Sequence, residues 1–231
     1  MPDPKQVRAM FARIAGRYDL LNRVLSAGID RRWRRRAIDL AEEQAGKLEG
    51  RTVVDACCGT GDLSLLFAKR GARVVGVDFT SEMLGLARRG RPLERGLYAQ
   101  GDALRLPLEP GVADVVATAF GIRNVADRSA CLREMARVLR PGGLVLVLEF
   151  GLPKSRVLGA LYRFYFTRVL PRVGGWIAGD REAYRYLPDT VFDWPDAETF
   201  QGEMLAAGLV DCGHRSLSGG IAFLHWGRRQ P

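Results

Sequence analysis

The chain has 231 residues, of which 47% are hydrophobic and 26% charged, a balance typical of a globular protein with room for one α/β domain. It contains no run of 18 apolar residues, and residues 1–8 are polar, so we expect neither a membrane span nor an export segment and place the protein in the cytoplasm. The net charge of +9 is spread along the chain, whereas a nucleic-acid footprint is usually concentrated on one element.

The segment RRWRRR, residues 31–36, places arginines around one tryptophan. On a helical wheel, one apolar stripe collects Trp33, Ala37, Leu40 and Ala41. This spacing predicts a helix that buries the stripe and leaves the arginines in solvent, with Arg36 nearest the boundary. The alternative is that the arginine face binds phosphate groups.

The middle of the chain alternates strand-like and helix-like segments. Strands are predicted at 51–59, 72–78, 96–102, 113–120 and 144–150, and helices at 62–71, 80–90 and 127–143, the last ending at Pro141 and Gly142. This alternation predicts a parallel, doubly wound sheet with right-handed crossovers. Residues 210–227 predict a hairpin, turning at Gly219 and Gly220, that adds antiparallel pairing at the sheet edge. The aromatic-rich insertion 159–180 interrupts the alternation.

The cysteines and histidines do not suggest a metal site. Cys57, Cys58, Cys131 and Cys212 show no CxxC spacing, so we expect four reduced thiols. His214 and His225 have no cysteine partner at the spacing of zinc ligands.

The turn after the first predicted strand, DACCGTGDLS, departs from a dinucleotide-binding motif. Gly59 and Gly61 are present, but Ser64 stands where the third glycine belongs. Asp55 ends the strand, and its charge would oppose a pyrophosphate. Both features favour a ligand that carries an amine and no phosphate, such as S-adenosylmethionine.

Further acids follow the next two strands. Asp78 is placed to accept from both ribose hydroxyls, and Asp102 to accept from the adenine amine, with Met83 packing on the adenine. The alternative is that these acids only cap helices. The expected cofactor residues are Asp55, Gly59, Thr60, Gly61, Asp78, Met83, Asp102, Ala103 and Ala119. The prediction is therefore a methyltransferase that uses S-adenosylmethionine, with a seven-stranded sheet.

The segment AFGIRNV follows the fourth strand, where base-modifying amino-methyltransferases carry an Asn/Asp-Pro-Pro-aromatic motif. It offers the guanidinium of Arg123 and the amide of Asn124, groups that suit an oxyanion such as a phenolate. An RNA methyltransferase and a non-catalytic module that binds S-adenosylmethionine remain as alternatives. The missing Pro-Pro motif opposes the first, and the intact Asp55, Asp78 and Asp102 beside FGIRN oppose the second.

Several motifs resemble the ubiquinone/menaquinone biosynthesis C-methyltransferase family: YDLLNRVLSAGIDRRW, AFGIRNV, REMARVLRPGGLVLVLEF, AGDREAYRYLPDTV and SLSGGIAFLHWG. The likeness extends over about residues 8–227. It implies the class I methyltransferase fold in a single domain, 1–231, with a helical cap at 1–45 and a helical lid insertion at 151–190. It also implies methyl transfer from S-adenosylmethionine to a ring carbon of a polyprenylated quinol.

Three positions depart from the family pattern: Asp30 replaces a histidine, Cys57 a small residue, and Gly151 a serine. Asp30 puts in doubt any role that the histidine has in contacting substrate.

The resemblance also directs the catalytic predictions. We expect Arg123 and Asn124 to hold or deprotonate the quinol through water, and Tyr18 either to close the ring pocket or to pack as a buried tyrosine. The aromatic insertion, with Leu161, Tyr162, Phe164, Tyr165 and Phe166, either forms helix core or a lid over an apolar tail tunnel that touches the membrane.

A quinol with a long isoprenoid tail lies in membrane. If the arginine face binds phosphate groups, anionic lipids are therefore favoured over nucleic acid, and the cytoplasmic protein would make peripheral contact with the inner face of the membrane. The oligomeric state is left open between a monomer and a homodimer. The chain lacks the longer leader of family members that act on both precursors, which favours demethylmenaquinol over a benzoquinol precursor of ubiquinone.

Overall fold

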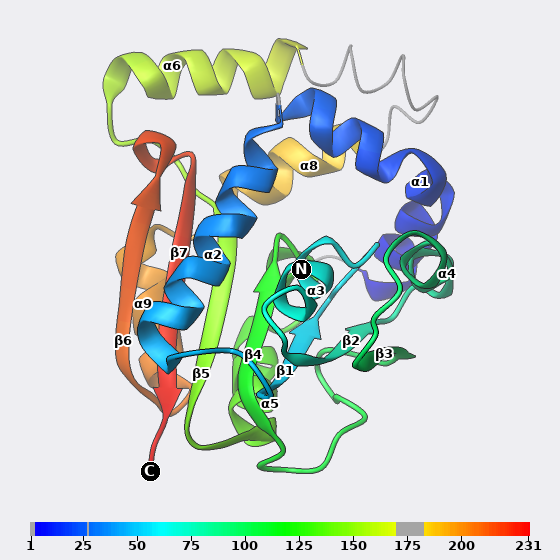
Figure 1. Ribbon diagram of the computed structural model, residues 1–231. Coiled ribbons are helices and arrows are strands. Elements are labelled where there is room, and N and C mark those ends of the chain that lie inside the picture. The colour runs from blue at the N-terminus through cyan, green and yellow to red at the C-terminus, as the bar shows by residue number, and fades with distance from the viewer. Residues whose placement is uncertain (1–2, 27, 170–182) are drawn as a thin grey trace.

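The computed structural model describes residues 3–26, 28–169 and 183–231 (Figure 1). The strands are β1 (Thr52–Ala56), β2 (Arg73–Asp78), β3 (Gly96–Gln100), β4 (Ala113–Ala119), β5 (Leu139–Phe150), β6 (Leu209–Leu217) and β7 (Ala222–Arg229). The helices are α1 (Pro4–Leu25), α2 (Ile29–Ala45), α3 (Asp62–Ala68), α4 (Ser81–Gly90), α5 (Arg128–Val138), α6 (Arg156–Phe164), α8 (Ala183–Phe192) and α9 (Ala197–Ala206). Three short helical turns are η1 (Ile122–Asn124), η2 (Tyr165–Val169) and η3 (Ser218–Gly220).

The strands form one seven-stranded sheet in the order β3-β2-β1-β4-β5-β7-β6. β1 to β5 pair in parallel, and β7 pairs antiparallel with both β5 and β6. The predicted fold class is confirmed, including the antiparallel hairpin at the edge. Because β1 has β2 on one side and β4 on the other, the carboxyl ends of these strands border the crevice where ligands bind in such sheets.

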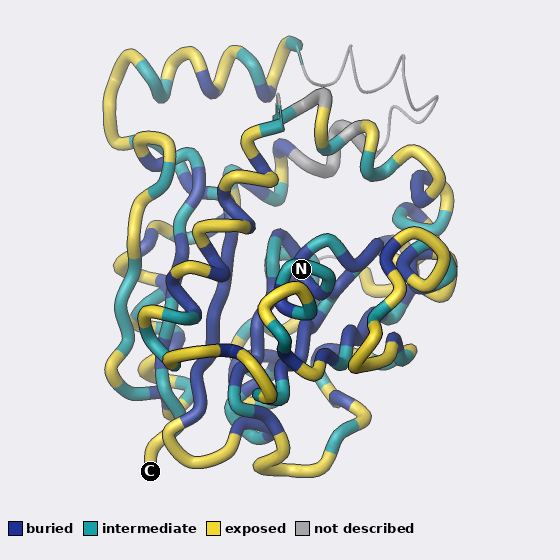
Figure 2. The backbone as a smooth tube through the Cα atoms, in the orientation of Figure 1, coloured by how far each residue is buried: buried dark blue, intermediate teal, exposed yellow. Residues whose placement is uncertain are grey.

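Helices cover both faces of the sheet, and Figure 2 shows the buried strands between them. On one face, α2 and α3 contribute Trp33, Ala37, Leu40 and Phe67 to a core over β1, β4 and β5. On the other face, α5 and α9 pack through buried apolar side chains. The apolar stripe predicted for the helix around RRWRRR is therefore buried as expected.

A third apolar cluster lies beyond the carboxyl ends of the parallel strands. It joins α1, α6, η2 and α8 through Met10, Ile14, Tyr162, Phe166 and Val191. Figure 1 shows these helices at the end of the sheet toward which β6 points. The helices thus stand on the side of the molecule where the crevice opens.

One predicted helix boundary was wrong, and one predicted segment is described only in part. The helix predicted at 127–143 ends at Val138, because Leu139 already pairs with Ala113 of β4 and begins β5. Asp127 caps this helix by accepting from the backbone N–H of Ala130 at 2.9 Å. In the predicted insertion, residues 170–182 lie outside the described residues.

Candidate active site

An open cavity lies at the carboxyl ends of β1, β2 and β4. Its walls include ten of the residues predicted from sequence: Tyr18, Asp55, Gly59, Thr60, Asp78, Met83, Asp102, Ala103, Ala119 and Asn124. Two predicted residues, Gly61 and Arg123, do not line it. We call this space the first cavity.

The glycine turn after β1 explains why glycine is needed at two positions. Gly59 and Gly61 have φ angles of 55° and 86°, in the left-handed region that side chains disfavour. A Cβ on Gly61 would also lie 2.4 Å from the hydroxyl oxygen of Tyr98. Gly61 therefore shapes the turn from behind, while Gly59 and Thr60 face the first cavity.

Asp55 is buried at the end of β1, and its carboxylate is only partly satisfied. The hydroxyl of Ser64 donates to Oδ2 at 2.5 Å, so the residue in place of the third glycine has a defined contact. Within the described residues, Oδ1 has no hydrogen-bond partner. Burial raises the pKa of Asp55 to about 7, against the hydrogen bond from Ser64.

Asp78 and Asp102 organise the two neighbouring strand ends. Asp78 accepts from the backbone N–H groups of Gly59 at 2.9 Å and Thr80 at 2.8 Å, which joins the glycine turn to the start of α4. Asp102 accepts from the backbone N–H of Leu104 at 2.9 Å. Burial raises the pKa of Asp78. Each carboxylate thus has a structural contact as well as a place on the cavity wall.

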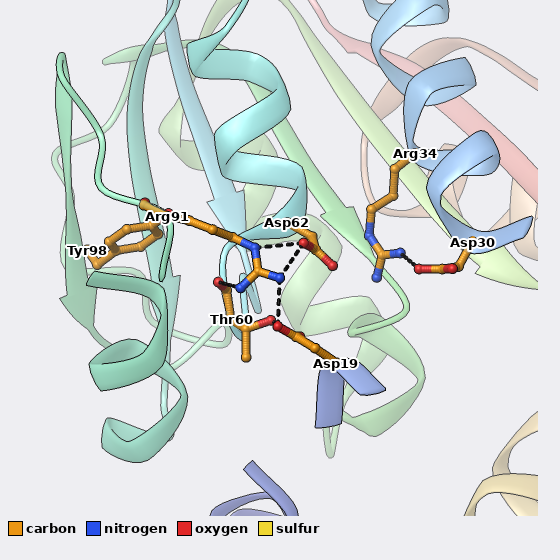
Figure 3. A network of polar contacts seen from close by, with 7 residues as sticks. All are labelled: Asp19, Asp30, Arg34, Thr60, Asp62, Arg91 and Tyr98. Atoms are coloured by element: carbon orange, nitrogen blue, oxygen red, sulfur yellow. Dashed lines mark hydrogen bonds and ion pairs between the residues drawn. The ribbon is translucent and has the colours of Figure 1, made fainter. Parts of the chain in front are cut away.

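Arg91 ties α1 to the rim of the first cavity (Figure 3). Its guanidinium lies 2.6 Å from carboxylate oxygens of both Asp19, on α1, and Asp62, at the start of α3. It also donates to the carbonyl of Thr60 at 3.0 Å, and the Thr60 hydroxyl donates to Asp19 at 2.6 Å. We call these four residues the Arg91 network. Sequence reasoning missed it because it joins distant segments.

The turn at residues 120–124, which we call the FGIRN turn, places its two polar side chains in different cavities. Asn124 lines the first cavity, whereas Arg123 lines a second cavity, and Val125 and Ala126 line both. Arg123 donates to the carbonyl of Phe120 at 2.7 Å and to the carboxylate of the fully buried Glu149 at 2.7 Å. Its guanidinium carbon lies 5.1 Å from the ring centre of Phe150.

Comparison with known proteins gives the family. The family model described as the ubiE/COQ5 methyltransferase family matches residues 2–229. The chain belongs to this family. It is 49% identical to a demethylmenaquinone methyltransferase of Thermus thermophilus over 95% of the chain and 100% of that protein. It is 42% identical to the ubiquinone/menaquinone biosynthesis C-methyltransferase UbiE of Geobacter sulfurreducens over 97% of the chain and 89% of that protein.

The fold is shared more widely than the family. A methyltransferase from Thermotoga maritima that depends on S-adenosylmethionine superposes with a TM-score of 0.68 at 18% identity, covering 96% of this chain and 99% of that one. The fold alone therefore does not identify the substrate.

Asp30, one of the positions at which the sequence departs from the expected pattern, makes a specific contact in the structure. Asp30 is buried and lies 2.5 Å from the guanidinium of Arg34, one turn along α2, while the Ser26 hydroxyl donates to it at 2.8 Å. Arg34 is also buried and lines the first cavity. The expectation that Arg34 belongs to the solvated arginine face was wrong, because the buried side of α2 is wider than the predicted stripe.

The remaining arginines of RRWRRR are exposed, with the Arg36 side chain at 60%, as the wheel predicted. Arg34 differs because its position beside Trp33 places it on the buried side of α2, where it pairs with Asp30. Its guanidinium carbon lies 5.2 Å from the ring centre of Phe120. An acid and a base at i, i+4 beside a core tryptophan is the signal that would have identified this pair.

The aromatic insertion contributes both inward and outward side chains. Tyr162 and Phe166 are buried against α1 and α8, whereas Leu161 and Phe164 are exposed. Tyr18 lines the first cavity and packs edge-on against Phe11, and burial raises its pKa. In the described part of the chain, no helix is long and apolar enough to span a membrane, and no metal-binding group of His, Cys, Asp and Glu occurs.

Proposed function

We propose that this protein transfers a methyl group from S-adenosylmethionine to a ring carbon of a polyprenylated naphthoquinol, converting a demethylmenaquinol to a menaquinol. The observation that carries the proposal is the near-full-length likeness to the demethylmenaquinone methyltransferase of Thermus thermophilus. Fold alone would not carry it, because one fold supports many reactions.

The first cavity fits the cofactor. The unpartnered Oδ1 of Asp55 is a buried acceptor for the cofactor's ammonium, and Arg34 beside it offers a cation for the carboxylate. Asp78 is the candidate for the ribose hydroxyls, and Asp102 and Met83 for the adenine. When bound, S-adenosylmethionine supplies an electrophilic methyl group on a sulfonium.

The chain's own residues must then bind and activate the acceptor. A quinol ring carbon is a weak nucleophile until a ring hydroxyl loses its proton, so the site needs a cation near that oxygen. Arg123 and Asn124, on the turn shared by both cavities, are the candidates to hold the oxygen, and Tyr18 to bound the ring.

The choice of naphthoquinol is tested by the size of the acceptor. The second ring adds apolar area, worth about 25 cal/mol per Å² when buried. Naphthoquinols should therefore show a higher kcat/KM than benzoquinols with the same tail. Purified protein with labelled S-adenosylmethionine and separate demethylmenaquinol, benzoquinol and RNA acceptors provides the measurement.

Each outcome of that assay has a meaning. A higher kcat/KM for the benzoquinol would assign the protein to ubiquinone biosynthesis instead. Transfer to RNA alone, or to no acceptor despite tight binding of S-adenosylhomocysteine, would reject quinol methylation.

We propose that the outer face of α6 contacts an anionic membrane surface. Val157, Leu161 and Phe164 form a stripe at i, i+4 and i+7, with 73%, 61% and 60% of each residue exposed. Residues 151–169 contain no acid, and their basic residues are Lys154, Arg156, Arg163 and Arg168. An apolar stripe flanked by cations is typical of helices that lie in the lipid interface.

Vesicle sedimentation tests this contact. Replacing Val157, Leu161 and Phe164 with serine should abolish binding to phosphatidylglycerol vesicles and leave activity on a short-tailed quinol intact. Leu205→Ser, at an exposed leucine on α9, is the matched control. If vesicle binding persists in the triple variant, the α6 face is not the membrane contact. If the triple variant instead loses a homodimer in sizing experiments, the α6 face serves self-association.

A further inference from the structure

Three buried polar atoms without partners gather behind the FGIRN turn. Within the described part of the chain, no hydrogen bond reaches Nε of Arg123, Oε2 of Glu149 or the hydroxyl of Tyr162. Arg123 and Glu149 are in contact at 2.7 Å through other atoms, and both of their charges act on the Tyr162 hydroxyl. The groups come from η1, β5 and α6, so three separate elements converge here.

Such atoms are costly to bury, and folded proteins contain only a few. Their gathering at one place indicates that a polar group enters. The set offers one donor on Arg123, one acceptor on Glu149, and a Tyr162 hydroxyl that can do either. A hydroxyl group matches it, since a hydroxyl donates one hydrogen bond and accepts two.

We propose that Glu149 accepts the proton of the acceptor's ring hydroxyl, while Arg123 and Tyr162 hold the oxygen. This inference rests on the proposed quinol methylation. It assigns the proton to a carboxylate, because an arginine stays protonated in proteins and is a poor base. Arg123 then stabilises the oxyanion as charge develops.

The electron pairs and protons balance. The quinol O–H bond breaks with its pair left on oxygen, and the proton forms a new bond to Oε2 of Glu149. The pair moves into the ring, whose ortho carbon bonds to the methyl carbon as the methyl–sulfur bond breaks onto sulfur. The same ring carbon then loses its hydrogen as a proton, and the C–H electron pair restores the aromatic ring while the oxygen regains its own pair. Glu149 returns its proton to that oxygen, so the one proton released to solvent for each methyl transferred is the proton from the ring carbon.

The surroundings of Glu149 suit this role. Burial raises the pKa of Glu149, opposed by the charge of Arg123, which makes the ionised form a stronger base than an exposed carboxylate. Among the described residues, the charged or titratable groups that act on it are Arg123 from η1 and Tyr162 from α6. Arg123 also lines the second cavity, which shares Val125 and Ala126 with the first, so the oxygen site adjoins the proposed cofactor site.

The test varies the acidity of the acceptor. With an ordinary quinol, whose hydroxyl pKa is about 10, Glu149→Gln should lower kcat/KM by about 100-fold or more. With an electron-poor quinol already ionised at the assay pH, the variant should recover most of the wild-type rate. Tyr162→Phe should lower kcat/KM by the same factor for both acceptors. Glu134→Gln, at a carboxylate paired with Arg137 on α5, is the control expected to match wild type.

If Glu149→Gln lowers kcat/KM equally for both acceptors, the role of Glu149 is structural and the inference is overturned. Should that variant not fold, wild type decides. With S-adenosylmethionine kept saturating, its kcat/KM for the ordinary quinol should fall more steeply at low pH than its kcat/KM for a quinol that stays ionised over the same pH range, and identical profiles would refute the role. If wild type methylates no quinol of either kind, quinol methylation itself fails, which separates the two results.

Discussion

Replacing Asp19 with alanine should loosen α1 over the first cavity. Asp19 is the residue of α1 that enters the Arg91 network, accepting from Thr60 and Arg91 at 2.6 Å each. Hydrogen bonds to a charged group are worth about 1.5–3 kcal/mol each, so two give at least about 3 kcal/mol. Because the Asp19 side chain is 29% exposed, solvent screens part of this, and we take about 2 kcal/mol.

A loss of about 2 kcal/mol corresponds to about a 30-fold shift toward the detached helix. Because Phe11 and Tyr18 of α1 line the first cavity, the affinity for S-adenosylhomocysteine should fall by up to this factor. Calorimetry measures the affinity, and hydrogen exchange of α1 amides should show faster opening. Asp39→Ala, which removes an exposed pairing with Arg70, is the control. Unchanged affinity together with unchanged protection of α1 would refute the reasoning.

Three other changes act on the cofactor directly. Asp78→Ala should weaken S-adenosylhomocysteine binding by about 10-fold or more, and calorimetry showing no loss would remove it from the site. The pKa of Asp55 is raised to about 7, so ionising it lowers folding stability as pH rises from about 4 toward 7. Cofactor affinity should instead rise through pH 7, because the ionised carboxylate binds the cofactor's ammonium. Asp55→Asn should flatten that rise. Arg34→Gln should weaken binding by about 10-fold, whereas Arg31→Gln and Arg35→Gln should not; equal effects in titrations would contradict its separate role.

Local sequence signals were enough to predict the sheet. The runs at β1, β4 and β5 are short, apolar and rich in valine or leucine, so each identifies a buried strand without knowledge of its neighbours. The start of β5 could not be predicted this way. Leu139 continues a helical pattern, and its pairing with Ala113 decides its conformation.

The candidate site likewise contains residues that could be predicted from local sequence and residues that could not. Asp55, Asp78 and Asp102 were found because each stands where a strand ends, a position that sequence reveals. Arg91 and Glu149 act through segments distant in the chain, so spacing could not place them. Glu149 still carried a signal, because it is a charge inside an apolar strand, and such a residue requires a buried partner.

The position of β7 has a consequence for how the chain folds. β7 is the last strand in sequence, yet it lies between β5 and β6. Until residues 222–229 have been synthesised, β6 has no strand to pair with, and the outer edge of β5 stays open along Leu144–Phe150. An open, apolar strand edge invites pairing with other chains. We therefore expect the nascent chain to be most prone to aggregation before residues 222–229 pair between β5 and β6.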